Sequence, residues 1–142
     1  MLAGVVLTPL QRIPTPGGDV RHALKASDAG FAGFGEAYFS SVDRGAVKGW
    51  KRHTRMCMNL VVPVGAVRFV VRSVEGETAV IDLSPDPTER YARLTVEPGL
   101  WMAFQGRGDG LNLVLNLASI EHDPAEAEAR PIEAFRWDWT DG

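Results

Sequence analysis

The chain has 142 residues, of which 45% are hydrophobic and 23% charged, and its net charge is −3. This length suits one domain with its own core, and the mild negative charge excludes a protein that binds nucleic acid through bulk electrostatics. The single Cys57 excludes an internal disulfide, and no apolar run approaches bilayer-spanning length, so we expect a soluble cytoplasmic protein with no membrane partner.

Strand-like runs recur between Pro and Gly residues along most of the chain. The Gly-rich residues 106–110 lack the Lys-Ser/Thr of a phosphate loop, so we expect a hairpin turn there. Residues 124–130 are rich in Ala and Glu after an Asp-Pro start, which predicts a short C-terminal helix with Asp123 as N-cap. In chain order, we expect strands over residues 5–10, 36–42, 59–64, 66–73, 79–83, 91–96, 100–105 and 111–119, and a short element of unassigned type over residues 20–24. Many short strands indicate an antiparallel sandwich or barrel.

Between the strands expected at 36–42 and 59–64 lies a basic segment, which we interpret as a loop. It places cations beside an aromatic side chain on a chain that is acidic as a whole. This local contrast favours a specific ligand that carries phosphate or carboxylate. The residues concerned are Lys48, Trp50, Lys51, Arg52, His53 and Arg55.

The spacing of this segment resembles the first motif of the cupins, in which a glycine is followed by two histidines, a glutamate and a second glycine. Gly45, His53 and Gly65 fall at the expected intervals, but Lys51 replaces the first histidine and Met58 replaces the glutamate. A divalent metal needs three or four convergent nitrogen and oxygen ligands, which a lone imidazole beside an ammonium does not supply. We therefore expect no metal site.

Residues 98–102 occupy the place of the second cupin motif, and the usual histidine is again absent. A cupin frame without metal ligands resembles the RmlC-type cupins, the dTDP-4-dehydrorhamnose 3,5-epimerase family and its sugar-nucleotide relatives. The resemblance runs from about residue 7 to 138, and it rests on Glu36, Tyr38 and Ser40, then Gly45 and residues 48–51, and later residues 122–126 and 136–138. It implies one RmlC-like domain over residues 1–142, an all-β antiparallel jelly-roll barrel with a short C-terminal helix.

The chain differs from this family at the positions of the catalytic residues. The family has its histidine base at the position of Lys51 and a phosphate-binding arginine at that of Lys48. Near the family's enolate-stabilising lysine this chain has Asn59, and in the region of the family's acidic tyrosine it has residues 120–122. The phosphate-facing cation is thus kept, whereas the usual acid–base set is not.

Two residues of the basic segment are our candidates for catalysis. Proton transfer next to a carbonyl needs a base and a group that holds the enolate oxygen. We assign Lys51 and His53 to proton transfer or ketone polarisation, with Lys51 as the candidate base and His53 as the group that supplies or accepts the second proton. His53 matches the second histidine of the H-x-H pair of ketoisomerase relatives. The alternative is that His53 is a structural residue of the barrel and the lysines form a solvated rim. For substrate binding we assign Glu36, Lys48, Arg55 and Trp101.

The resemblance implies a sugar-nucleotide epimerase or isomerase of deoxysugar or surface-polysaccharide synthesis. Its substrate would be a 4-keto-6-deoxysugar linked to a nucleoside diphosphate, converted without a cofactor by a homodimer. One alternative is a non-catalytic sugar-nucleotide or carbohydrate-binding cupin with a degenerate site. Another is a structural or interaction protein with a vestigial pocket.

Overall fold

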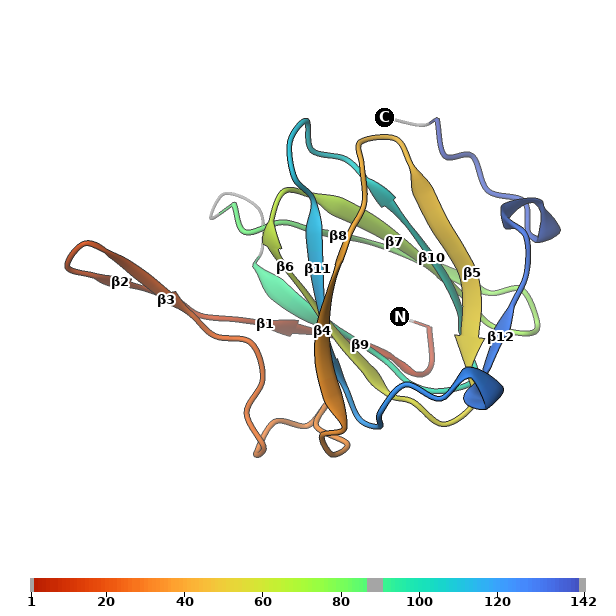
Figure 1. The fold of residues 1–142 in the computed structure, drawn as a ribbon, viewed down its shortest axis with the longest axis horizontal. Helices are drawn as coiled ribbons and strands as arrows, with labels where there is room; N and C mark the ends of the chain where they lie inside the picture. The colour runs from red at the N-terminus through yellow and green to blue at the C-terminus, as the bar shows by residue number, and fades with distance from the viewer. Residues whose placement is uncertain (1, 87–90, 141–142) are drawn as a thin grey trace.

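The computed structural model describes residues 2–86 and 91–140, and these fold almost entirely into antiparallel β-strands. Two five-stranded sheets face each other, the first with strand order β1-β9-β6-β11-β4 and the second with order β12-β5-β10-β7-β8 (Figure 1). The strands are β1 Val5–Pro9, β2 Arg12–Thr15, β3 Gly18–Arg21, β4 Glu36–Ser41, β5 Val47–His53, β6 Met58–Val64, β7 Val67–Arg72, β8 Thr78–Leu83, β9 Ala92–Val96, β10 Trp101–Gly106, β11 Leu113–Ala118 and β12 Ala127–Ala129. The predicted all-β jelly roll is confirmed. Within the described ranges, no helix is long and apolar enough to cross a membrane.

The space between the sheets is filled with side chains over one half of the molecule. Phe69, Val71, Leu83, Leu94 and Val96 from β7, β8 and β9 are buried there. Each such side chain stabilises the fold by about 1.5–3 kcal/mol through its removal from water. The other half, toward β4 and β5, contains the cavity described below.

Strand β5 occupies the segment that we interpreted as a basic loop, so that interpretation was wrong. It pairs with β10 and with β12, partners that lie far along the chain. The register shifts so that Met102 lies opposite Lys51 and Phe104 opposite Lys48, which leaves one extra residue on β5. Both lysines therefore line the cavity, although strict alternation would place them on opposite faces. The sequence shows the charges but not this bulge.

Residues 124–130 are not the predicted helix. Pro124–Glu126 forms a single 3-10 turn, which Asp123 caps as expected, and β12 then pairs with β5. The Ala- and Glu-rich composition is only a weak preference for helix, and tertiary contacts override it. Here the contacts are the strand pairing of β12 and the burial of the Glu126 carboxylate against β5.

The Gly-rich residues 106–110 do not form the predicted hairpin turn, because β10 and β11 belong to different sheets. The connection crosses from the second sheet to the first. Asn112 fixes this crossing, since its side-chain oxygen accepts from the backbone N–H groups of Ala66 and Gly108 and its amide donates to the carbonyl of Val42. The sequence of a Gly-rich connection does not show whether it joins two strands of one sheet or strands of two different sheets.

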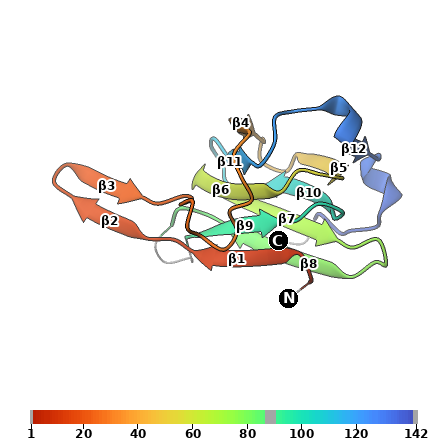
Figure 2. The ribbon, with the colours of Figure 1, turned by 90° about the horizontal axis from the view of Figure 1, so that it is seen from below.

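Strands β2 and β3 form an arm that projects from the barrel (Figures 1 and 2). Ile13 and Val20 lie opposite each other on it, and both are exposed. We expected only a short element near residues 20–24, because the prolines and glycines of residues 14–18 were interpreted as the stop that follows the first strand. A proline is tolerated in such a hairpin, where a missing N–H need not break a ladder.

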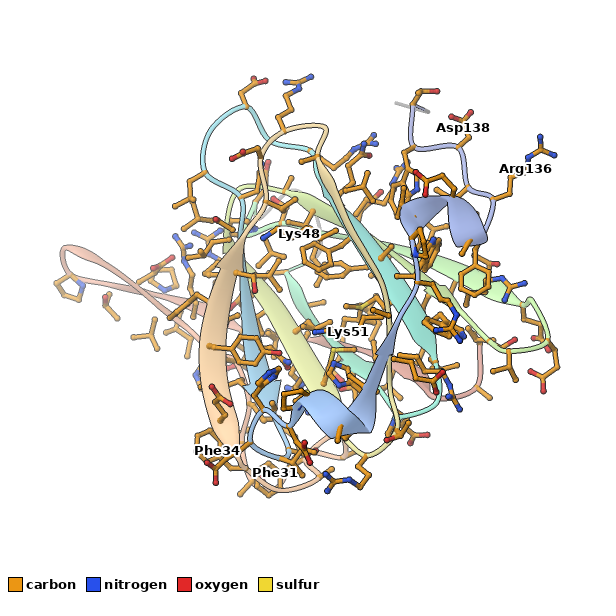
Figure 3. All side chains as sticks on the ribbon, turned by 45° about the vertical axis from the view of Figure 1, so that its right-hand side comes forward. Phe31, Phe34, Lys48, Lys51, Arg136 and Asp138 are labelled. Atoms are coloured by element: carbon orange, nitrogen blue, oxygen red, sulfur yellow. The ribbon has the colours of Figure 1, made fainter. Side chains whose placement is uncertain are left out.

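Residues 131–140 cover the outer face of the second sheet. The Trp50 indole N–H donates to the carbonyl of Ile132 at 3.0 Å, and the Gln105 amide donates to the carbonyl of Trp139 at 3.1 Å. The ring of Phe135 lies 5.4 Å from that of Trp50, centroid to centroid. Arg136 and Asp138 of this tail point away from the barrel (Figure 3). The tail therefore supports β5 from behind and takes no part in the cavity.

Candidate active site

A cavity of about 330 Å³ lies between the sheets, at the size of pockets that hold small ligands. Strands β5 and β10 form one wall, and β4, β6 and β11 form the other. The apolar part of the lining includes Met58, Leu60, Met102, Phe104 and Val114. The polar side chains of the lining are Tyr38, Ser40, Lys48, Lys51, His53 and Asn116.

His53, at the end of β5, forms a buried pair with Glu126. The two residues are 5% and 3% exposed, and the Nδ1 atom of His53 is hydrogen-bonded to Oε1 of Glu126. The other carboxylate oxygen, Oε2, accepts from the backbone N–H groups of Thr54 at 3.1 Å, Arg55 at 3.0 Å and Met56 at 3.2 Å. Both oxygens of the buried carboxylate are therefore satisfied.

These contacts fix which nitrogen of His53 carries a proton. Burial raises the pKa of Glu126, but hydrogen bonds from His53 and from the amides of Arg55 and Met56 outweigh it and lower the pKa to about 2. The carboxylate is thus ionised at neutral pH and can only accept, so Nδ1 of His53 donates to it. In the neutral ring, Nε2 then keeps a free lone pair and is the nitrogen available to a molecule in the cavity.

Two ammonium groups accompany this base. Lys51, two residues before His53, has no hydrogen bond or ion pair with any of the described residues and points into the space between the sheets (Figure 3). The Nζ atom of Lys48 donates to the backbone carbonyl of Ser41 at 2.6 Å and so links β5 to β4 across the cavity (Figure 3). The site is therefore positively charged at two points along one strand.

The opposite wall contributes a phenol. Tyr38 on β4 lines the cavity, and its oxygen accepts from the side-chain amide of Asn116 on β11 at 3.0 Å. Asn116 is 4% exposed, and its own oxygen accepts from the backbone N–H of Asn59 at 3.3 Å. A ligand in the cavity would thus lie between a base with two cations and a hydroxyl donor. Such a set of groups can move a proton at a carbon next to a carbonyl.

Of the residues assigned from sequence, Lys48, Lys51 and His53 come together in the cavity, whereas Glu36, Arg55 and Trp101 lie outside its lining. Glu36 accepts from the backbone N–H of His122 at 2.9 Å and joins β4 to the segment before β12. Arg55 is exposed and pairs with Asp123 at 3.0 Å. Trp101 faces the other side of β10, where its ring lies 5.3 Å from that of Phe135.

Glu126, Tyr38 and Asn116 were missed as site residues. Glu126 was assigned to the predicted helix, and nothing in the sequence indicates that it lies beside His53. The signal for Tyr38 was its alternation with Ser40 on a half-buried strand, which places both on one face. The signal for Asn116 was a polar residue in the middle of an otherwise apolar strand.

No protein-family model matches the chain, and no curated protein matches it in sequence. Solved structures, in contrast, match the chain in fold. The fold is that of the RmlC-like cupins. The dTDP-sugar isomerase of Desulfovibrio desulfuricans G20 is 34% identical to this chain, with a TM-score of 0.91 over 99% of this chain and 93% of that one. The chain therefore belongs to the RmlC-like cupin family that includes this isomerase.

Two further relatives share the fold at lower identity. The dTDP-4-dehydrorhamnose 3,5-epimerase of Sulfolobus tokodaii is 18% identical, with a TM-score of 0.82 over 97% of this chain and 83% of that one. The sugar 3,4-ketoisomerase QdtA of Thermoanaerobacterium thermosaccharolyticum, solved with TDP, is 22% identical, with a TM-score of 0.76 over 90% and 89%. Both a 3,5-epimerase and a 3,4-ketoisomerase thus use this architecture.

Proposed function

We propose that the protein is a metal-independent isomerase or epimerase that moves a proton next to the ketone of a 4-keto-6-deoxysugar joined to a nucleoside diphosphate. The observation that carries this proposal is the buried pair of His53 and Glu126, which presents a base to a cavity that accommodates a small ligand. The similarity to a dTDP-sugar isomerase supports the substrate class.

The proposed reaction is an enolisation. Nε2 of His53 takes the proton from a carbon next to the ketone, and the electron pair of that C–H bond forms a C=C bond while the carbonyl pair moves onto oxygen. The ammonium of Lys51 stabilises the resulting enolate oxygen. A proton returned to the other face of the same carbon re-forms the ketone and gives an epimer. For a keto isomer, the hydroxyl proton on the deprotonated carbon passes to the enolate oxygen, a proton is returned to the former ketone carbon, and the C=C electron pair and the released O–H pair leave the new C=O at the neighbouring carbon.

Lys48 is the proposed contact for the diphosphate. A lysine ammonium is a compact point charge, so it can exchange the carbonyl of Ser41 for a phosphate oxygen without the geometric demands of an arginine. The apolar floor formed by Leu60, Met102 and Val114 suits the methyl group of a 6-deoxysugar. We expect no cofactor for this reaction.

Solvent exchange tests the proposal. In D₂O, the wild-type protein is expected to introduce deuterium into dTDP-4-keto-6-deoxyglucose next to the ketone, as followed by proton NMR. His53→Gln removes the base and is expected to slow exchange by roughly 10²–10⁴-fold, and Lys51→Met by about 10²-fold. The matched control is His122→Gln, because the imidazole of His122 is exposed outside the cavity and its loss is expected to leave the rate unchanged.

Two other outcomes of this experiment would support the alternative functions. Binding of the sugar nucleotide without exchange in the wild type would support the non-catalytic binding cupin, in which Lys51 in the place of the family's histidine has ended catalysis. Absence of binding would support a structural role with a vestigial pocket.

We further propose that the protein is a cytoplasmic homodimer in which a second copy covers the outer face of the first sheet. Leu113, Leu115 and Leu117 are half-buried on that face, and Phe39 beside Leu115 is 61% exposed. Contiguous exposed apolar surface of this kind marks interfaces, and a two-fold axis lets one patch pair with its own copy. The projecting arm supports the same assembly, because an isolated two-stranded hairpin is marginally stable in water.

A further inference from the structure

The phenol of Tyr38 is held in one hydrogen-bonding role by the residues behind it. Asn59 donates its backbone N–H to the side-chain oxygen of Asn116, which orients the amide of Asn116. The NH₂ group of Asn116 therefore faces Tyr38 and donates to its oxygen at 3.0 Å. Because Asn116 is buried, this arrangement does not compete with bulk water.

The consequence is that the proton of Tyr38 is free for a ligand. A phenol has one proton to donate, and its oxygen is already engaged as an acceptor. No acceptor for that proton occurs among the described residues, and Tyr38 lines the cavity. A hydroxyl that accepts one hydrogen bond is also polarised toward donating another.

We propose that Tyr38 is a catalytic residue that donates a hydrogen bond to the ketone oxygen of the substrate from the wall opposite His53, and that Asn116 is its positioning residue. This inference rests on the proposed function. As His53 takes the proton from carbon and charge moves onto the ketone oxygen, the hydrogen bond from Tyr38 strengthens. Lys51 supplies charge from the β5 wall, whereas Tyr38 supplies a directional donor from β4.

The infrared carbonyl stretch of bound dTDP-4-keto-6-deoxyglucose, labelled with ¹³C at the ketone, reports this hydrogen bond whether or not the sugar reacts. In the wild type the stretch is expected to lie below its frequency in solution. Tyr38→Phe is expected to move it back toward the solution value and to slow deuterium exchange by about 10²-fold, with little change in the Kd of the sugar nucleotide. Tyr91→Phe is the matched control, because the hydroxyl of the second tyrosine donates to the carbonyl of His22 away from the cavity.

Asn116→Asp tests the positioning role with the phenol left in place. One carboxylate oxygen can still accept from Asn59, but the other now accepts the proton of Tyr38 and draws it away from the ligand. The carbonyl stretch and the exchange rate are expected to change as in Tyr38→Phe. A purely structural role for Asn116 would leave the stretch of the bound ketone where the wild type has it.

The results separate this inference from the function on which it rests. If exchange depends on His53 while the stretch and the rate are unchanged in Tyr38→Phe, the role of Tyr38 is refuted and the function stands. If the stretch depends on Tyr38 but the wild type exchanges no proton, the hydrogen bond to the ketone stands, and the enzymatic function fails together with the catalytic role of Tyr38. A sugar nucleotide that does not bind refutes both.

Discussion

The two carboxylate oxygens of Glu126 accept hydrogen bonds from different groups. A glutamine at this position would therefore change the contact with His53 and keep the contacts with the backbone. Oε2 accepts three backbone N–H groups, so the oxygen of a glutamine at this position is expected to take the same place. Its NH₂ group would then face Nδ1 of His53, which must become an acceptor. The proton moves to Nε2, and the base that faces the cavity is lost.

We therefore predict that Glu126→Gln slows exchange by roughly 10²–10⁴-fold and lowers the free energy of unfolding at pH 7 by about 2–4 kcal/mol. The folded-state pKa of about 2 lies below the ordinary value of 4.5. The stabilisation from Glu126 is therefore fully present above about pH 4.5 and is lost as the pH falls toward 2. Urea unfolding from pH 7 to pH 2.5 should show the difference between wild type and variant narrowing with acid. A constant difference would contradict the assigned pKa.

The bulged strand β5 is an example of a structural element that the sequence did not predict. Most strands could be predicted, because apolar runs between Gly and Pro residues mark them locally. β2 was missed because Pro14 was interpreted as a break. β5 and β12 were missed because the pairing of β5 with β10 and with β12 joins residues far apart in the chain. The lysines of the site were found through their charge, whereas Glu126 and Tyr38 become site residues only when the sheets close around them.

Gly49 at this bulge has φ of +141°, and a Cβ atom there would lie 2.5 Å from the Cβ of Ala103. Gly49→Ala is therefore expected to lower the free energy of unfolding by about 2–4 kcal/mol, through backbone strain and overpacking, and to weaken sugar-nucleotide binding because Lys48 and Lys51 move apart. Gly18→Ala is the control, since a Cβ there meets nothing within 4 Å, and a change within about 0.5 kcal/mol is expected. Equal costs for the two variants would show that the bulge imposes no constraint.

The two outer faces of the barrel differ in how they are covered. The chain's own aromatic tail covers the second sheet over β5, β7 and β10, whereas the first sheet leaves Phe39 exposed beside a row of leucines. Analytical ultracentrifugation is expected to show a dimer for the wild type and a monomer for Phe39→Lys. The matched control is Val80→Lys, since Val80 is also exposed but lies on the second sheet, and this variant should remain a dimer. A wild-type monomer, or an unaffected Phe39→Lys dimer, would exclude this interface.

The most direct test of the proposed proton transfer compares wild type and His53→Gln in D₂O with dTDP-4-keto-6-deoxyglucose. The NMR signal of a proton next to the ketone is expected to disappear with the wild type at catalytic protein concentration, and to persist with the variant even though the sugar nucleotide still binds. Equal rates of exchange for the two proteins, or no exchange above the protein-free rate, would contradict the proposed proton transfer.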